Sequence, residues 1–118
     1  MSELATFPTI ASFEAQAAKA AQFLKLMANE HRLLVLCHLL GKGEASVTEL
    51  VRETGLSQSA LSQHLARLRD DGLVAFRRDA QTLFYRVCDS RAESVLRVLK
   101  DIFCPNVGDP RNANHDRD

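Results

Sequence analysis

One stretch of the sequence, residues 57–71, carries polar side chains at a spacing that could support hydrogen-bond recognition. It reads SQSALSQHLARLRDD, and its apolar residues recur every three or four positions, which predicts a helix with one buried face. The opposite face offers Ser and Gln side chains that both donate and accept hydrogen bonds, as base edges in the major groove of DNA require. Ser57 and the first-turn amides could also bind a phosphate at the start of the helix. The candidate DNA-contacting residues of this segment are Ser57, Gln58, Ser59, Ser62, Gln63, His64 and Arg67.

The charged residues around this segment are unevenly placed. Between Ser57 and Val87 the chain uses arginine and no lysine, and the planar guanidinium suits phosphate and guanine. We expect Arg77 and Arg78, on a predicted hairpin, to approach the minor groove or the DNA backbone. The formal net charge of +0 argues against a purely electrostatic binder of nucleic acid.

The same polar residues could instead solvate an exposed helix or contact another protein. For any one of them, solvation is the simpler explanation. For the whole set it is not, because the face is nearly devoid of Glu and Lys, the usual choices for a merely soluble helix. A protein-interaction module therefore remains as an alternative to DNA binding.

Three cysteines, Cys37, Cys88 and Cys104, could carry thiol chemistry. Their odd number and the absence of a CxxC pair argue against a structural disulfide framework. Cys37 falls in an apolar segment, so we expect it to be buried, where cysteine often only fills space. Cys104 directly precedes Pro105 at the end of a predicted helix and should be more accessible. No His or acid is placed to activate Cys37, which argues against a thiol enzyme.

Five helices and one hairpin must position these residues. The second predicted helix is apolar all round, which is typical of a central buried helix. Ser46 and Glu49 resemble a capping box, in which each side chain satisfies a backbone donor of the other residue. The predicted helices cover residues 12–29, 30–41, 47–54, 58–71 and, from residue 89 or 90, the segment to 104; the hairpin covers residues 73–87 with its turn at 79–81.

Two short helices joined by a tight glycine-containing turn at 55–57 predict a helix-turn-helix. With the hairpin, the fold class is mainly α with a small β-hairpin, a winged helix-turn-helix in the order α-α-α-α-β-β-α. We expect a flexible N-terminal arm over 1–11, one domain over 12–104 and a disordered tail over 105–118. The sequence has no secretory signal and no apolar run near the roughly 18 residues of a membrane helix, so we expect a cytoplasmic protein.

Three segments together resemble the ArsR/SmtB family of dimeric winged helix-turn-helix repressors: NEHRLLVLCHLL, LSQSALSQHLARLRDDGLV and RRDAQTLFYRV. The resemblance extends from about Ala17 to Cys104. It implies a homodimer built through the first and last helices, which binds an imperfect palindrome in promoter DNA. A homodimer would also account for the large apolar stripe on the first helix.

The metal-sensing sites common in this family lack their ligands here. The third helix, SVTELVRET, has no CxC motif, and the last helix, DSRAESVLRVLKDIFC, has no His. His31, His38, His64 and His115 do not group with cysteines at ligand spacing. We therefore expect no metal site and no cofactor, with a metal or metalloid sensor of non-standard arrangement as the alternative.

The cysteine pattern resembles the sulfide- and redox-responsive subgroup of the family, the BigR, SqrR and HlyU type. The resemblance implies that Cys37 and Cys104 form a dithiol sensor, whereas Cys88 has no counterpart in the pattern and is taken as structural. The resulting hypothesis is a repressor that binds DNA when reduced. It would release DNA when persulfide, polysulfide or peroxide links the two thiols, and the sequence leaves the inducer open.

Overall fold

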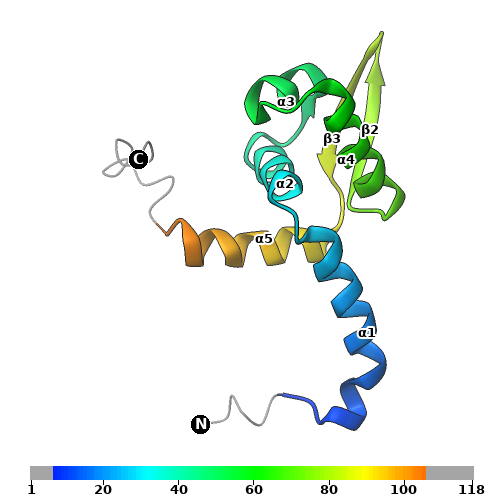
Figure 1. Cartoon of the computed structure of the whole chain (residues 1–118), viewed down its shortest axis with the longest axis vertical. Coiled ribbons are helices and arrows are strands. Elements are labelled where there is room, and N and C mark those ends of the chain that lie inside the picture. Colours follow the sequence, from blue (N-terminus) through cyan, green and yellow to red (C-terminus); the bar gives the residue numbers. More distant parts are fainter. Residues whose placement is uncertain (1–6, 106–118) are drawn as a thin grey trace.

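The computed structural model describes residues 7–105, which form five helices and a small antiparallel sheet (Figure 1). The predicted winged helix-turn-helix is confirmed. Most of the arm and tail expected at the two ends lies outside the described residues, so those boundaries stay predictions. The elements are α1 (Ile10–Met27), α2 (Glu30–Lys42), β1 (Ala45–Ser46), α3 (Val47–Thr54), α4 (Gln58–Asp70), β2 (Val74–Asp79), β3 (Thr82–Val87) and α5 (Ser90–Phe103).

Short polar side chains start the helices. Thr9 Oγ1 accepts a hydrogen bond from the Ser12 amide at 3.2 Å, so α1 begins at Ile10, two residues earlier than the predicted start. Asn29 caps α2 and Asp89 caps α5 in the same way. Because a side-chain oxygen replaces the missing helical partner, these residues fix where each helix begins.

The core lies between α2, α3, α4 and the sheet. It is built from aliphatic side chains, with Tyr85 of β3 as its one aromatic member. Three leucines of α4 point into it, which leaves the other side of α4 to solvent. The fully buried large side chains are Val35, Leu36, Leu39, Leu50, Leu61, Leu65, Leu68, Leu73 and Val74.

The sheet contains one strand that the sequence analysis missed. β1 pairs with β3, and β3 with β2, so the strand order is β1-β3-β2. The two-residue β1 is too short to show any alternation of apolar and polar side chains. In the β2–β3 hairpin, hereafter the wing, only Ala80 and Gln81 separate the strands, and Ala80 has a φ of 59°.

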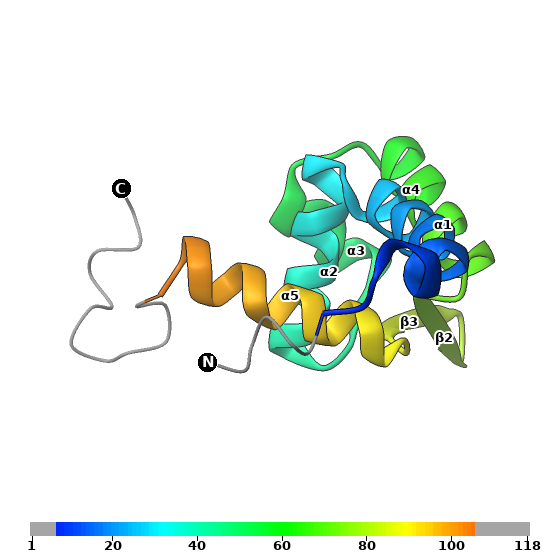
Figure 2. The same ribbon diagram turned by 90° about the horizontal axis from the view of Figure 1, so that it is seen from below.

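Two helices leave apolar side chains in water. Figures 1 and 2 show α1 extending away from the core, while α5 passes beneath α2 and continues beyond it on the other side. Ile10 is 88% exposed and Phe103 is 75% exposed. In the part of the chain described here, no helix is long and apolar enough to span a membrane. The exposed large apolar residues of α1 and α5 are Ile10, Phe13, Leu24, Val98, Ile102 and Phe103.

Helix α2 is buried on one side only, which corrects the expectation of an all-round buried helix. Val35, Leu36 and Leu39 face the core, whereas Leu34 and Cys37 are exposed. Residues 34 and 37 are one helical turn apart and share a face that the core does not cover. The predicted burial of Cys37 is therefore wrong, because apolar composition alone does not show which face of a helix meets the core.

Candidate nucleic-acid interface and thiol pair

The helix-turn-helix is formed by α3 and α4, which meet at Gly55, Leu56 and Ser57. Gly55 has a φ of 75°, a left-handed conformation that glycine adopts at little cost, and it ends α3. The Thr54 hydroxyl donates to the Leu50 carbonyl at 2.7 Å and accepts from the Leu56 amide at 3.3 Å. These bonds tie the turn to α3 and so fix the direction in which α4 leaves it.

The outer side of α4 carries four of the predicted DNA contacts. They are all exposed, because Leu61, Leu65 and Leu68 take the buried side of the helix. Ser57 lies at the start of α4, where its hydroxyl accepts from the Ala60 amide at 3.1 Å. We call the following residues the reading face: Gln58, Ser59, Ser62 and Gln63.

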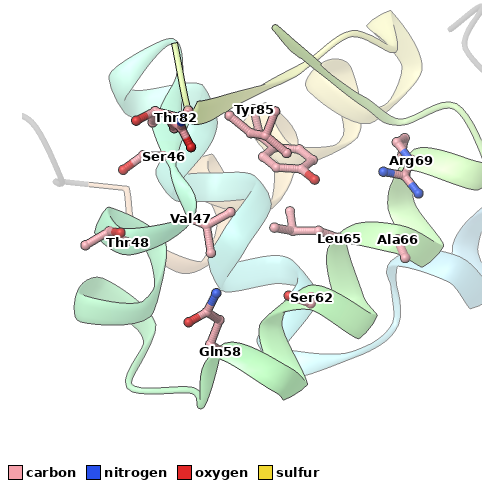
Figure 3. Close-up of a pocket in the computed structure, with 12 residues that line it drawn as sticks. Ser46, Val47, Thr48, Gln58, Ser62, Leu65, Ala66, Arg69, Thr82 and Tyr85 are labelled. Carbon is pink, nitrogen blue, oxygen red and sulfur yellow. The ribbon is translucent and has the colours of Figure 1, made fainter. Parts of the chain in front are cut away.

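A groove separates α4 from the wing and from the start of α3 (Figure 3). It has a volume of about 490 Å³, and its α4 wall includes Gln58 and Ser62 of the reading face. Thr48 of α3 and Thr82 of β3 also line it, so hydroxyl groups contribute to its walls (Figure 3). Such a groove, with polar walls beside a helix that can enter DNA, suits a sugar-phosphate strand.

Arg69 is a residue of this groove that the sequence analysis did not select. It lines the α4 wall and lies over the Phe76 ring, with its guanidinium carbon 5.7 Å from the ring centre. Its spacing from Ser62 is seven residues, two helical turns, which places both on one side of α4. That spacing was the signal that could have identified it.

The two wing arginines point to opposite faces of the hairpin. Arg77 pairs with Phe84 in register and Arg78 with Leu83, and successive residues of a strand alternate between its faces. Leu83 lines the groove, so Arg78 belongs to the groove side. Arg77 instead donates two hydrogen bonds to Glu44, at 3.0 and 2.6 Å, and lies 4.7 Å from the centre of the Phe84 ring.

The Arg77–Glu44 contact holds the wing against the loop before β1. The hydrogen bond from Arg77 lowers the pKa of the Glu44 carboxyl, and the charges of Arg77 and Arg86 lower it further. Glu44 is thus ionised at neutral pH and occupies Arg77. Arg77 has a structural partner here, which the sequence analysis did not foresee.

Two further predicted contacts lie away from the groove. His64 is half-buried, and its ring centroid is 5.9 Å from that of His31 on α2. Burial lowers the pKa of His64, and the nearby charges of Arg32 and His31 lower it further. Arg67 pairs with Asp71 at 3.1 Å on the side of α4 that faces α1.

Cys37 and Cys104 lie close enough to interact electrostatically. Burial raises the pKa of the Cys37 thiol even though its side chain keeps contact with solvent, and the Cys104 thiolate raises that pKa further. Cys104 is exposed and forms the C-cap of α5, where its amide bonds to the Lys100 carbonyl at 2.7 Å. Two exposed thiols distant in sequence, one on α2 and one at the end of α5, are thus electrostatically coupled. Cys88 lies elsewhere, with its thiol 3.4 Å from the Gly72 carbonyl.

A polar bridge joins the Cys37 helix to α3. His38 Nε2 lies 2.7 Å from Glu49 Oε2, and Lys42 Nζ lies 3.6 Å from the same oxygen. The hydrogen bond with His38 lowers the pKa of Glu49. This contact corrects the predicted capping box: Ser46 accepts from the Glu49 amide at 3.1 Å, but the Glu49 carboxylate bonds to α2.

Among residues 7–105, no three His, Cys, Asp or Glu side chains gather closely enough to hold a metal ion. His31 and His64 form a pair with Arg32 beside them, and a positive charge there disfavours a cation.

Comparison with known proteins gives a consistent result. Residues 29–75 match the family model described as "Bacterial regulatory protein, arsR family". The chain is 46% identical over 96 residues to the HTH-type transcriptional regulator YgaV of Escherichia coli, covering 81% of this chain and 97% of that protein. It is 50% identical over 91 residues to the transcriptional activator HlyU of Vibrio cholerae, covering 77% of this chain and 83% of HlyU.

Two solved structures extend the likeness to three dimensions. Reduced HlyU from Vibrio cholerae superposes with a TM-score of 0.74 at 49% identity, covering 79% of this chain and 97% of that chain. The transcriptional repressor BigR from Xylella fastidiosa superposes with a TM-score of 0.75 at 37% identity, covering 82% of this chain and 98% of BigR.

Proposed function

Within the arsR family of bacterial regulatory proteins, to which this chain belongs, we propose that it acts as a dithiol-switched repressor. Its relatives are transcriptional regulators, so the chain is a DNA-binding regulator of transcription and not an enzyme. In the proposed function, the reduced protein binds a palindromic promoter site. A link between Cys37 and Cys104 releases it. The observation that carries the proposal is the placement of two exposed thiols, Cys37 on the uncovered face of α2 and Cys104 at the C-cap of α5, with the charge of Cys104 acting on Cys37.

The reading face and the groove support the DNA contacts. Gln and Ser side chains of α4 enter the major groove and bond to base edges. Arg69 and Arg78, on opposite sides of the groove, bind the phosphates of a strand that runs through it, and the Thr48 and Thr82 hydroxyls add bonds to the same strand. Base contacts give the sequence preference, and the phosphate contacts fix the register.

The exposed apolar residues of α1 and α5 support a homodimer. Side chains such as Phe13 and Ile102 gain stability when a second copy covers them. A two-fold dimer presents two copies of α4, and a palindromic site requires them about 34–36 Å apart, one turn of DNA. The spacing between the two α4 helices therefore controls affinity.

The thiol reaction follows from the accessibility of the two cysteines. The Cys104 thiolate attacks hydrogen peroxide and becomes a sulfenic acid with loss of hydroxide; Cys37 then displaces water and forms the disulfide. With a small persulfide, Cys104 takes the outer sulfur and releases the thiol of the donor. Cys37 then attacks the inner sulfur and releases hydrogen sulfide. If both cysteines first become persulfides, the same displacement leaves a trisulfide.

The link acts by fixing the end of α5 to α2. Since α5 belongs to the proposed dimer interface, a shift at its end changes how the two copies meet. The His38–Glu49 contact connects α2 to α3, so the helix-turn-helix follows α2. The two α4 helices then move away from the spacing that DNA requires.

Operator binding by variants tests the proposal. Using the promoter upstream of its own gene, we expect reduced protein to shift the DNA and persulfide- or peroxide-treated protein to lose most of its affinity. Cys37→Ser and Cys104→Ser should bind DNA after treatment as before it, whereas Cys88→Ser is the matched control and should respond like the wild type. If treatment released Cys37→Ser or Cys104→Ser from the DNA, the proposal would be contradicted.

Two further experiments distinguish this proposal from a metal or metalloid sensor and from a transcriptional activator. Zinc or arsenite that releases the untreated protein from DNA would favour a metal or metalloid sensor. A promoter reporter distinguishes repression from activation, since BigR is described as a repressor and HlyU as an activator. We expect the reporter to be expressed more strongly when the gene of the regulator is deleted. Weaker expression of the reporter would contradict the proposal that the protein is a repressor.

A further inference from the structure

A second pocket lies on the side of α4 away from the groove. It is an open pocket bordered by the second half of α1, the end of α4 and the start of α5, and has a volume of about 400 Å³. That volume is within the range of pockets that hold small molecules in proteins. None of its residues belongs to the reading face or to the thiol pair.

The rim of this pocket is positively charged. Lys19 and Lys25 come from α1, Arg67 from α4 and Arg91 from α5, against one lining carboxylate, Asp71. Arg67 pairs with Asp71 at 3.1 Å, and Arg91 pairs with Asp89 at 2.7 Å. Within residues 7–105, neither lysine has a carboxylate oxygen within 4.0 Å of its Nζ. An excess of positive charge therefore remains for a ligand.

Phe23 supplies the accessible apolar surface at the floor of the pocket, above two buried leucines. Phe23 is half-buried, Leu26 and Leu73 are buried, and all three line the pocket. The Arg91 guanidinium lies over the Phe23 ring, with its central carbon 4.8 Å from the ring centroid. An aromatic floor beside guanidinium and ammonium groups matches a ligand with a flat body and one anionic group.

We propose that this pocket binds a small organic anion with an aromatic or otherwise flat apolar body. Its carboxylate or phosphate lies among Lys19, Arg67 and Arg91, and its body lies against the accessible part of Phe23. A DNA phosphate would use the charges but not the apolar floor, so the pocket favours a small molecule over the nucleic-acid backbone.

The pocket stays accessible in the proposed dimer. Four of its five α1 residues, at positions 19, 22, 23 and 26, follow the spacing i, i+3, i+4, i+7, so they share one side of the helix. The exposed apolar residues Phe13 and Leu24 fall on a different side, in line with positions 17 and 20. A second copy that covers Phe13 and Leu24 therefore leaves the pocket face of α1 uncovered.

A ligand here would connect a helix of the dimer interface to the recognition helix. Arg67 belongs to α4, Lys19 to α1 and Arg91 to α5, so one anion contacts three elements whose relative positions set the α4 spacing. The site gives the regulator an input separate from the thiols. It goes beyond the proposed function and does not depend on it.

Ligand binding without DNA tests this inference. The probe is 2-naphthoate, followed by isothermal titration and by amide chemical shifts of the reduced full-length chain, with 2-naphthalenemethanol and inorganic phosphate as comparison probes. We expect saturable binding of 2-naphthoate, with the largest shifts in residues 19–26, 67–73 and 91. 2-Naphthalenemethanol keeps the flat body without the anionic group, and phosphate keeps the anionic group without the body. Each should therefore bind at least roughly tenfold more weakly than 2-naphthoate.

Matched variants complete the test. Lys19→Glu and Arg91→Gln should each weaken 2-naphthoate by roughly tenfold, because each removes a charge-assisted contact. Arg52→Glu on α3 and Arg97→Gln on α5 make the same charge changes outside the pocket and should bind like the wild type. Equal binding of the neutral probe, unchanged affinity of Lys19→Glu and Arg91→Gln, or shifts centred on Phe13 and Leu24 would each overturn the inference. Because no DNA is present, failure here leaves the thiol-switch proposal intact.

Discussion

Cys37 lies on the face of α2 that the core leaves uncovered, and the charge of Cys104, at the end of α5, acts on it. Burial by its neighbours raises the pKa of the Cys37 thiol first, and the charge of Cys104 raises it second. At neutral pH, Cys37 is therefore mostly the protonated thiol, a weak nucleophile. This favours the order of reaction proposed above, in which Cys104 reacts first and Cys37 completes the link.

Replacement of Cys104 should change the titration of Cys37. In Cys104→Ser we expect the pKa of Cys37 to fall but to stay above its ordinary value of 9.0, because burial, the larger cause, remains. The rate of Cys37 alkylation against pH, read by peptide mass spectrometry, gives this pKa. Cys88→Ser is the control and should leave it unchanged. An unaltered Cys37 titration in Cys104→Ser would mean that the two thiols do not interact.

His64 should make the stability of the fold depend on pH. Its pKa is lowered from 6.5, chiefly by burial, so on acidification the unfolded chain takes up a proton before the folded one does. The free energy of unfolding therefore has its full value, as far as His64 is concerned, above about pH 6.5, and it decreases as the pH falls below that value. His64→Gln, which cannot titrate, should show a flatter dependence of the unfolding free energy on pH in urea titrations. A slope as steep as that of the wild type would assign the effect to other groups.

At the scale of elements, the sequence predicted the helices well and the faces of the helices less well. Polar caps such as Ser57 and the turn glycine Gly55 are local signals, so α3 and α4 could be placed from the chain alone. The two-residue β1 has no local signal. The exposure of Cys37 and the pairing of Arg77 with Glu44 depend on neighbours far away in sequence, and no local pattern reports them.

The register of the wing separates the roles of its two arginines. Arg78→Ala should weaken operator binding about tenfold and reduce the salt dependence by about one unit of slope, as loss of one phosphate contact does. Arg77→Ala, which loses the Glu44 contact, should lower the unfolding free energy and change the salt slope less. Fluorescence anisotropy at several salt concentrations measures both slopes. A larger salt effect of Arg77→Ala would reverse the assignment.

For the whole molecule, the exposed apolar side chains of α1 and α5 predict that the monomer is not the working unit. Leu24→Glu should raise the dissociation constant of the dimer at least roughly 100-fold, because two-fold symmetry places the change twice in one interface. Operator affinity should fall with it, since a monomer contacts only half of a palindrome.

Ala15→Glu, a change on another side of α1, is the control for the dimer and should remain dimeric. Sedimentation velocity measures both variants. A dimeric Leu24→Glu protein would place the interface elsewhere.

One paired measurement tests the thiol switch most directly. Protein is treated with increasing persulfide, and each sample is divided between operator binding and peptide mass spectrometry of the Cys37–Cys104 link. We predict that the fraction unable to bind DNA equals the fraction linked through these two residues at every dose, and that dithiothreitol reverses both together. Full release from DNA while Cys37 and Cys104 remain unlinked, or linked protein that still binds with full affinity, would contradict the switch.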